Sequence, residues 1–479
     1  MSKSPRWARI AVVSMLSMLA GCDSLDARPV FGQVKRDIAE RTGQLVQWNT
    51  GSDEDAAAQA RVAQLLQDRL TLDEAIQVAM LNNPHLQATY ERLGIAQANL
   101  VQAGLLKNPI FDAEVKFLDN VSGTRAIVEM AVVQDFLDVL MVPLRRRLAR
   151  AQLDAVRSQV IGKVLDVVAE VRIAFVSVQA SEHTLATLRQ NLQATDASYD
   201  AARRLSKAGN ITDLELANER ALYERSKLAV ASAETSLVEA RERMNRVLGL
   251  WGGRTTWAIS PDLPNVPAEP FDANGLESKA VAASVDLEVL RDRMRVVAAR
   301  TGIEATELVF PELMAGAAAE YEGPEDKWNA GPAVSVAIPV FDWGQARTAQ
   351  GRHRLRALWQ QYAATAIELR SAVRSATVRL RNARRQSEYY RRVLLPLAER
   401  VTSETQLQYN AMQLGVFQLL AAKRNEIDLR RQYIDARRDY WIARTELEQI
   451  LAGRMLRRSQ VQVSLPGGGG GMDEGGGGH

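Results

Sequence analysis

The chain has one cysteine, Cys22, and its surroundings favour lipid attachment over a disulfide or a redox reaction. It ends an N-terminal segment in which basic residues from Lys3 to Arg9 precede an apolar run from Ile10 to Leu19, the composition of a secretory signal. A lone thiol has no partner for an internal disulfide. Because Leu19-Ala20-Gly21-Cys22 has the form of a bacterial lipobox, we expect acylation of Cys22, for example with palmitate. The alternative is an ordinary signal followed by an incidental cysteine.

No other group of residues suits catalysis. The sequence contains no H-E-x-x-H helix, no P-loop and no G-x-S-x-G elbow. Its four histidines, which lack the spacing of metal ligands, are His85, His183, His353 and His479. We therefore expect no enzyme, no catalytic residues and no cofactor. In the glycine-rich tail, Met472 and His479 are weak candidate ligands for a soft metal ion, but plain disorder explains this composition more simply.

The charge balance does not indicate a nucleic-acid-binding protein. The chain has 60 basic and 57 acidic residues. Three of the basic residues, Lys3, Arg6 and Arg9, belong to the signal segment, so the remaining chain carries no excess of either sign. A protein that binds nucleic acid through its phosphates needs a marked basic excess or a basic face. We expect no nucleic-acid partner.

Alternating charged and apolar residues predict strands with one wet and one apolar face. Asp112, Glu114 and Lys116 alternate with apolar residues, and Glu312 and Glu320 belong to a second alternating segment. The expected strands are 111–117, 125–136, 313–321 and 333–340. Each is long enough to cross a bilayer when tilted. The strands must be held by the remainder of the chain, which is helical in pattern.

The helical segments recur with a shift of roughly two hundred residues, which indicates an internal repeat. Each unit reads as helix, two strands, a long helix, a glycine turn and a returning helix. The expected helices are 56–68, 71–83, 84–106, 142–207, 213–248, 275–307, 345 to about 409, and 417–451. At 1.5 Å per residue the longest are on the order of 100 Å long. Pro396 predicts an interruption within the second long helix.

These patterns divide the chain into six parts. They are a signal peptide (1–21), an acylated N-terminal extension (22–70), a first repeat (71–249), a proline- and glycine-rich linker (250–272), a second repeat (273–453) and a disordered tail (454–479). Four strands cannot close a barrel, and an open edge in lipid would leave backbone groups unpaired at a cost of several kcal/mol each. The chain is therefore expected to form an oligomer whose strands close together.

The arrangement resembles the outer-membrane efflux protein family, of which the TolC channel is typical, in its lipoprotein branch. The resemblance covers about 71–453 and rests on Leu72-Asp73-Glu74-Ala75 with Asn83-Pro84, on the segment from Val336 to Gly344, and on the two glycine turns. It implies a mainly α fold in which long antiparallel helical hairpins form a periplasmic tube. Four transmembrane strands per chain would close, in a homotrimer, into a twelve-stranded barrel in the outer membrane of a Gram-negative bacterium.

The family also implies a passive role in transport. Substrate would come from an inner-membrane pump through a periplasmic adaptor and leave through the barrel. The turns that would meet the adaptor contain Gly209, Asn210, Leu414 and Gly415. The candidate residues of a periplasmic gate are Asp213, Glu215 and Gln418, although both acidic residues suit a helix N-terminus equally well. Asp112, Glu114, Lys116, Glu312 and Glu320 are expected to face a wet lumen, the extracellular rim being the alternative.

Two other functions remain open at this point. A channel of this type can serve protein secretion of type I instead of efflux. A periplasmic coiled-coil adaptor or scaffold lipoprotein would explain the helices and the acyl anchor but would leave the strands without a role. Within the efflux interpretation, the cargo is either heavy metal ions, such as copper or silver, or drugs. The channel sequence does not distinguish them, because the pump selects the cargo.

Overall fold

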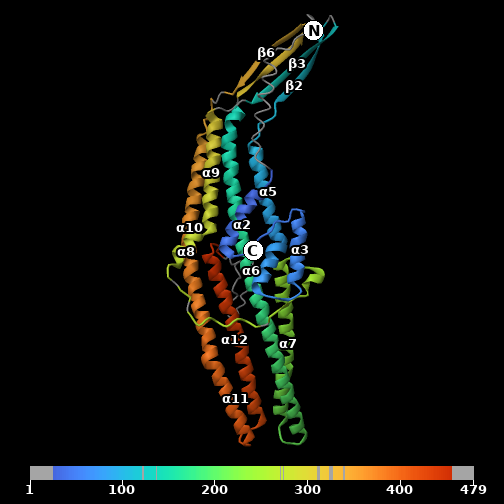
Figure 1. Cartoon of the computed structure of the whole chain (residues 1–479), viewed down its shortest axis with the longest axis vertical. Helices are drawn as coiled ribbons and strands as arrows, with labels where there is room; N and C mark the ends of the chain where they lie inside the picture. The colour runs from blue at the N-terminus through green and yellow to red at the C-terminus, as the bar shows by residue number, and fades with distance from the viewer. Residues whose placement is uncertain are drawn as a thin grey trace, which may run out of the picture.

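The computed structural model describes residues 25–120, 123–135, 137–260, 262–269, 271–272, 274–309, 313–322, 327–337 and 340–455. The molecule is a long rod (Figure 1). A four-stranded sheet forms one end, the turns of two helical hairpins form the other, and short helices surround the middle. The mainly helical fold with a small strand portion was predicted from the sequence.

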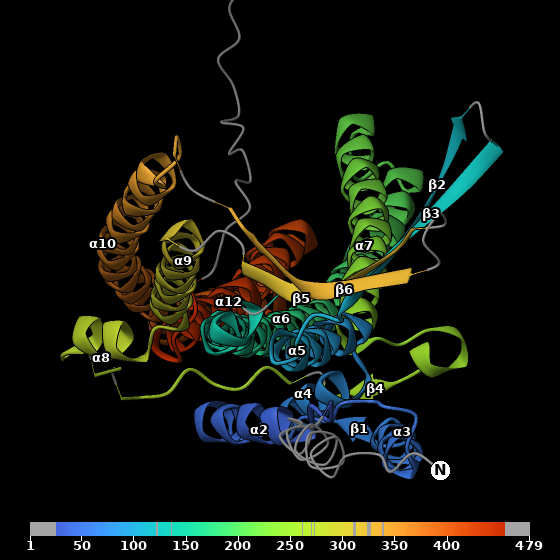
Figure 2. The same ribbon diagram turned by 90° about the horizontal axis from the view of Figure 1, so that it is seen from above.

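Four helices stand side by side beneath the sheet. In order around the molecule they are α5 (Pro84–Ala103), α6 (Leu137–Lys207), α9 (Val285–Val309) and α10 (Gln345–Tyr389). Seen from above, they form part of a curved wall (Figure 2). The wall is one layer of helices thick, so each helix has one side facing the concave surface and one facing the convex surface.

The sheet continues this wall upward. Its antiparallel strands are β2 (Ile110–Asn120), β3 (Gly123–Asp135), β5 (Leu313–Glu322) and β6 (Lys327–Val336), paired in the order β2-β3-β5-β6. This order matches that of the helices, because α5 leads into β2, β3 leads into α6, α9 leads into β5, and β6 leads towards α10. Helix α6 begins at Leu137, earlier than predicted, because the Asp135 carboxylate accepts hydrogen bonds from the amides of Leu137 and Asp138.

The lower half of the rod consists of two antiparallel hairpins. Helix α6 returns as α7 (Asp213–Leu248), and α10 continues as α11 (Leu395–Asn410) before returning as α12 (Val416–Leu451). The 71 residues of α6 give it a length of about 105 Å. The interruption predicted at Pro396 takes the form of a π-helical turn, η2 (Tyr390–Leu394), directly before the proline. This wider turn accommodates a residue that has no amide hydrogen.

The N-terminal extension, in which only a helix over 56–68 was predicted, also contains a helix, α2 (Arg28–Thr42). Phe31, Val34 and Ile38 recur at helical spacing and are buried in the largest core. This core also includes residues of α3 (Asp53–Leu65) and α4 (Leu72–Asn82). Within the predicted linker, the structure contains a 3-10 turn, η1 (Gly252–Thr255), and a short strand, β4 (Ala258–Ile259), that pairs in parallel with β1 (Arg69–Leu70). The prediction for both segments was incomplete because their partners are distant in sequence.

Two segments of the second repeat differ from the prediction. The helix expected over 275–307 is two helices, α8 (Leu276–Ala283) and α9, because the Ser284 hydroxyl accepts a hydrogen bond from the Leu287 amide and starts a new helix. The strand expected over 333–340 is β6, which begins six residues earlier and ends at Val336. Its pairing with β5, from Glu322↔Lys327 to Leu313↔Val336, fixes both ends.

Each returning helix ends against the start of an upper helix. In the first repeat, the Asn83 side chain donates to the carbonyl of Val247 (2.7 Å), next to Gly249. In the second, the Val285 amide donates to the carbonyl of Gly453 (2.8 Å). The Arg41 guanidinium of α2 adds hydrogen bonds to the carbonyls of Ala283 and Ala452. These two junctions hold the halves of the rod in line.

Candidate functional site

The register of the sheet brings polar residues from four strands into one row. Glu114 lies opposite Glu129, Glu129 opposite Glu320, and Glu320 opposite Asn329. Residues directly opposite in a sheet point to the same face. The Lys116 ammonium lies 2.6 Å from a Glu129 carboxylate oxygen and 3.5 Å from one of Glu114, so part of the row's negative charge is neutralised.

The other face of the same sheet is apolar and uncovered. Side chains from several strands are exposed there although they are large and apolar. They are Phe111, Val115, Phe117, Met130, Val132, Leu313, Trp328, Val334 and Val336. A contiguous apolar surface of this kind is not expected in water, and it marks a face that contacts lipid or another apolar phase.

Four of the five predicted strand residues lie on the polar face, namely Asp112, Glu114, Lys116 and Glu320. The fifth, Glu312, lies outside the described residues. The sequence analysis missed Glu129, because the second strand has apolar residues on both faces around it and only the register reveals its neighbours.

Both edges of the sheet are open. Among the strands that the structure describes, β2 pairs only with β3 and β6 only with β5. Each outer edge therefore presents a row of unpaired amide and carbonyl groups, which is an energetic liability in water and a larger one in lipid. Pairing of β6 with the β2 edge of a second copy would satisfy both rows.

The turns of the two hairpins have the same geometry but different residues. In the first, Gly209 has φ 75° and Thr212 caps α7. In the second, Met412 has φ 58° and Gly415 is the N-cap of α12, so Gly415 corresponds to Thr212. The expectation that Gly415 is the counterpart of Gly209 was wrong. The left-handed position is thus taken by a methionine that is 94% exposed. The sequence gives no warning of this, since the prediction searched for glycine.

This difference predicts opposite effects of two substitutions. Met412→Gly should raise the free energy of local opening of the second turn by about 1 kcal/mol, because a residue with a β-carbon is strained at positive φ. Gly209→Met should lower the free energy of local opening of the first turn by a similar amount. No atom lies within 4 Å of the added β-carbon, so only the backbone strain is added. Amide hydrogen exchange of the turn residues measures both, and the reverse order of protection would contradict the assignment.

The predicted gate residues lie at the starts of the returning helices. Glu215 accepts hydrogen bonds from the Thr212 amide (2.8 Å) and hydroxyl (2.9 Å), and these bonds lower the pKa of its carboxyl group. Asp213 is exposed in the same first turn, and Gln418 occupies the position in α12 that Glu215 has in α7. Glu215 therefore helps to cap the N-terminus of α7 within a single copy of the chain.

The two hairpin turns should therefore respond differently to pH. The folded pKa of Glu215 lies below its ordinary value of 4.5, so its capping contribution is present above that value and is lost as the pH falls through the folded pKa. Gln418 does not titrate. We expect the protection of the Thr212 amide against hydrogen exchange to fall as the pH drops through the folded pKa of Glu215 in the wild type, and to lose this pH dependence in Glu215→Gln. Equal acid sensitivity of Gly415 would contradict the prediction.

A buried carboxylate joins the two hairpins above their turns. Glu219 of α7 accepts a hydrogen bond from the Ser198 hydroxyl of α6 (2.5 Å), and the Arg424 guanidinium of α12 lies 3.4 Å from the same carboxylate. Glu219 is buried. Charged residues are seldom buried without such partners, so this group fixes the spacing of the hairpins at that level.

No metal site emerges from the part of the chain that the structure describes: it contains no group of three or more His, Cys, Asp or Glu side chains placed to hold an ion. Cys22, Met472 and His479 lie outside the described residues. None of the helices in the described ranges has a stretch long and apolar enough to span a membrane.

Comparison with known proteins gives a partial match to a family model and a shared fold. Residues 75–250 match the outer membrane efflux protein family. The cobalt-zinc-cadmium resistance protein CzcC of Cupriavidus metallidurans is 25% identical over 397 residues, which are 80% of this chain and 90% of that protein.

Solved structures extend the similarity to both repeats. The outer membrane channel CmeC of Campylobacter jejuni matches with a TM-score of 0.67 at 14% identity, over 80% of this chain and 86% of CmeC. The outer membrane channel MtrE of Neisseria gonorrhoeae, solved in an open state, matches with a TM-score of 0.64 at 17% identity, over 81% of this chain and 90% of MtrE. Residues 75–250 therefore match the outer membrane efflux protein family, and the described structure has the fold of these channels.

Proposed function

We propose that the chain is the outer-membrane channel of a tripartite efflux system, which passively conducts substrate from a periplasmic adaptor and an inner-membrane pump to the exterior. The observation that carries this proposal is the sheet with one charged face, one exposed apolar face and two open edges. Such a sheet is stable in a bilayer only when copies close it into a barrel. A homotrimer would give twelve strands, with the row around Glu114 inside and Val132 against lipid.

The helical wall would then continue the lumen into the periplasm. Because the strands and the upper helices share one order, closing the strands also closes the helices into a tube. The hairpin turns at Gly209, Asn210, Leu414 and Gly415 would meet the adaptor at the far end. Asp213, Glu215 and Gln418, which lie beside these turns, are the candidates for a gate.

Helix α2 supports the proposal that Cys22 carries the lipid anchor. Val30 packs against the cluster of Ala96, Leu100, Ala149 and Leu153 in the upper parts of α5 and α6. Arg41, at the other end of α2, reaches the middle junction. The N-terminus of α2 therefore points towards the sheet end. Six residues from Cys22 to Arg28 span at most about 20 Å, so the anchor would lie within that distance of the N-terminus of α2.

The proposed cargo is a heavy metal cation. The name of CzcC connects that relative with resistance to cobalt, zinc and cadmium, and we extend this to the present chain as a proposal. Drugs remain the second candidate cargo, because CmeC and MtrE have the same fold and a fold does not determine a substrate. Protein secretion of type I would use the same conduit with a different pump.

Growth inhibition of a deletion strain tests the cargo. We expect the deletion strain to be hypersensitive to cobalt, zinc and cadmium salts. The wild-type gene should restore resistance, and a Cys22→Ala variant, which lacks the proposed anchor, should not. Hypersensitivity confined to dyes and antibiotics would overturn the metal cargo and leave the channel proposal intact. Absence of any ion conductance from the purified protein in planar bilayers would overturn the channel proposal itself.

A further inference from the structure

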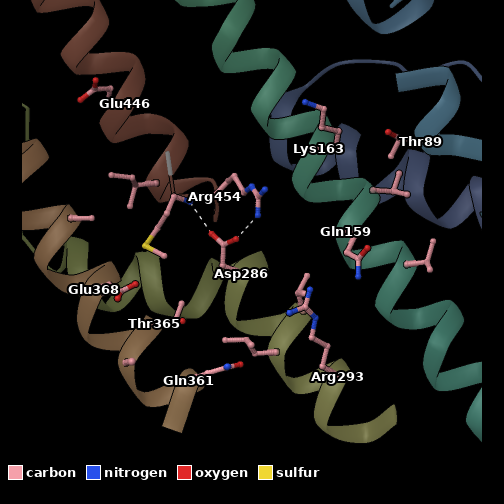
Figure 3. Close-up of a pocket in the computed structure, with 18 of the residues that line it drawn as sticks. Thr89, Gln159, Lys163, Asp286, Arg293, Gln361, Thr365, Glu368, Glu446 and Arg454 are labelled. Carbon is pink, nitrogen blue, oxygen red and sulfur yellow. Dashed lines mark hydrogen bonds and ion pairs between the residues drawn. The ribbon is translucent and has the colours of Figure 1, made fainter. Parts of the chain in front are cut away.

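A large charged groove lies in the wall at the level of the middle junctions. It has a volume of about 1100 Å³ and lies between α5 and α6 on one side and α9, α10 and α12 on the other (Figure 3). Its charged lining residues are Arg92, Lys163, Asp286, Arg293, Glu368, Arg379, Glu446 and Arg454. The sequence does not reveal this group, because its members lie on five separate helices and, for Arg454, just after the end of α12.

The groove opens on the concave side of the wall. On α6, Arg157 hydrogen-bonds Gln33 of α2 (2.9 Å), and α2 lies on the convex side (Figure 2). Gln159 lies about 200° around the helix from Arg157, and Lys163 is one turn further along. Both line the groove, so the groove faces away from α2 and into the concavity that would become the lumen.

The cations of the groove outnumber the carboxylates that could pair with them. Arg379 pairs with Glu446 (2.9 Å). Arg454 pairs with Asp286 and, at 2.9 Å, with Asp166. Within the described residues, Arg92, Lys163 and Arg293 make no hydrogen bond or ion pair with another side chain, and Glu368 is the only groove carboxylate left to face them.

We propose that this groove binds a small multivalent oxyanion. Three unpaired cations from three helices line it, and their combined positive potential concentrates anions. Gln159 and Thr365 place an amide and a hydroxyl donor on the same surface, and the buried Nε of Arg379 has no acceptor. Phosphate-like oxyanions accept several such charge-assisted hydrogen bonds at once. The proposal rests on the proposed function only in placing the groove inside a conduit.

The consequence for transport is a change of sign along the lumen. The sheet end would present carboxylates of the row around Glu114, whereas the middle would present a ring of cations, repeated in each copy. An anion held in the groove would reduce the barrier that this ring raises against a passing metal cation. Anion binding at the groove would thus favour cation passage.

Calorimetric titration of the full-length protein in detergent with inorganic pyrophosphate tests the proposal. Lys163→Gln/Arg293→Gln should weaken binding about 10-fold or more, because two charge-assisted contacts are removed. The matched control is Arg356→Gln/Arg370→Gln, which removes the same charge from α10. Around α10, Arg356 lies about 120° and Arg370 about 160° from Glu368, so both point away from the groove. The control should bind pyrophosphate within about twofold of the wild type.

Absence of binding to the wild type, or equal losses in the groove variant and the control, would overturn the proposal. Conductance of the same three preparations in planar bilayers separates it from the proposed function. A conducting protein that binds no pyrophosphate refutes the groove and leaves the channel standing. A protein that binds pyrophosphate but never conducts refutes the channel and keeps the groove as a binding site.

Discussion

Gly453→Ala should reduce the yield of folded protein severely, and Gly249→Ala should do so nearly as much. Gly453 and Gly249 have φ 107° and 71°, where a β-carbon is strained. A β-carbon at Gly249 would lie 2.6 Å from the carbonyl oxygen of Asn82, and one at Gly453 would meet the carbonyl oxygen of Ala283 more closely still. Because the close contacts are with backbone atoms, which cannot easily move aside, we expect the free energy of unfolding to fall by about 2–5 kcal/mol at each site.

Gly209 provides the matched control for this prediction. It also has a positive φ, 75°, but nothing lies within 4 Å of its would-be β-carbon. Gly209→Ala should therefore cost only the strain, about 1 kcal/mol. Thermal unfolding in detergent and resistance to limited proteolysis measure all three variants. Equal behaviour of Gly209→Ala and Gly453→Ala would show that the close approach at the junctions contributes nothing.

Val132→Arg should prevent stable insertion of the protein into a bilayer. Val132 is 48% exposed on the apolar face, opposite Phe111 and Ala317 in the register. An arginine on the lipid face near the middle of a membrane costs about 2–4 kcal/mol per copy, and a trimer would bear that cost three times. Folding into liposomes, followed by flotation and by heat-resistant β-structure, measures the effect.

Ala131→Arg is the control, because the neighbouring residue of β3 points to the opposite face. Ala131 lies opposite Asp112 and Ala318, on the face with the row of carboxylates. An arginine there would face water and a carboxylate, so insertion should remain close to that of the wild type. If Ala131→Arg blocks insertion and Val132→Arg does not, the two faces have been assigned the wrong way round.

Local signals in the sequence were sufficient for the long helices. The capping boxes at Thr71 with Glu74 and at Thr212 with Glu215 are complete within four residues, and both appear in the structure. The returning helix α7 begins and ends where its cap and Gly249 predict. Strand alternation was equally readable where one face is charged, as around Glu114, because charge cannot move to an apolar face without cost.

Features that depend on distant partners were not readable. Strand β4 consists of Ala258 and Ile259, and it exists only because β1 pairs with it. Glu129 gained a role only through its register with Glu114 and Glu320. The charged groove draws single residues such as Lys163 and Arg293 from separate helices, so no local pattern marks it. Met412 shows a third limit, since the surrounding hairpin imposes a backbone conformation that methionine does not favour.

The closure of the sheet by several copies is the central claim, and imaging the full-length protein in lipid nanodiscs by electron cryomicroscopy tests it most directly. The account predicts three copies around one axis, with β6 of each paired to β2 of the next in a closed barrel of twelve strands. The side chains of Glu114 and Glu320 should point inward and those of Val132 and Trp328 towards lipid. A sheet that stays open at β2 and β6, or a barrel with its charged face outward, would contradict it.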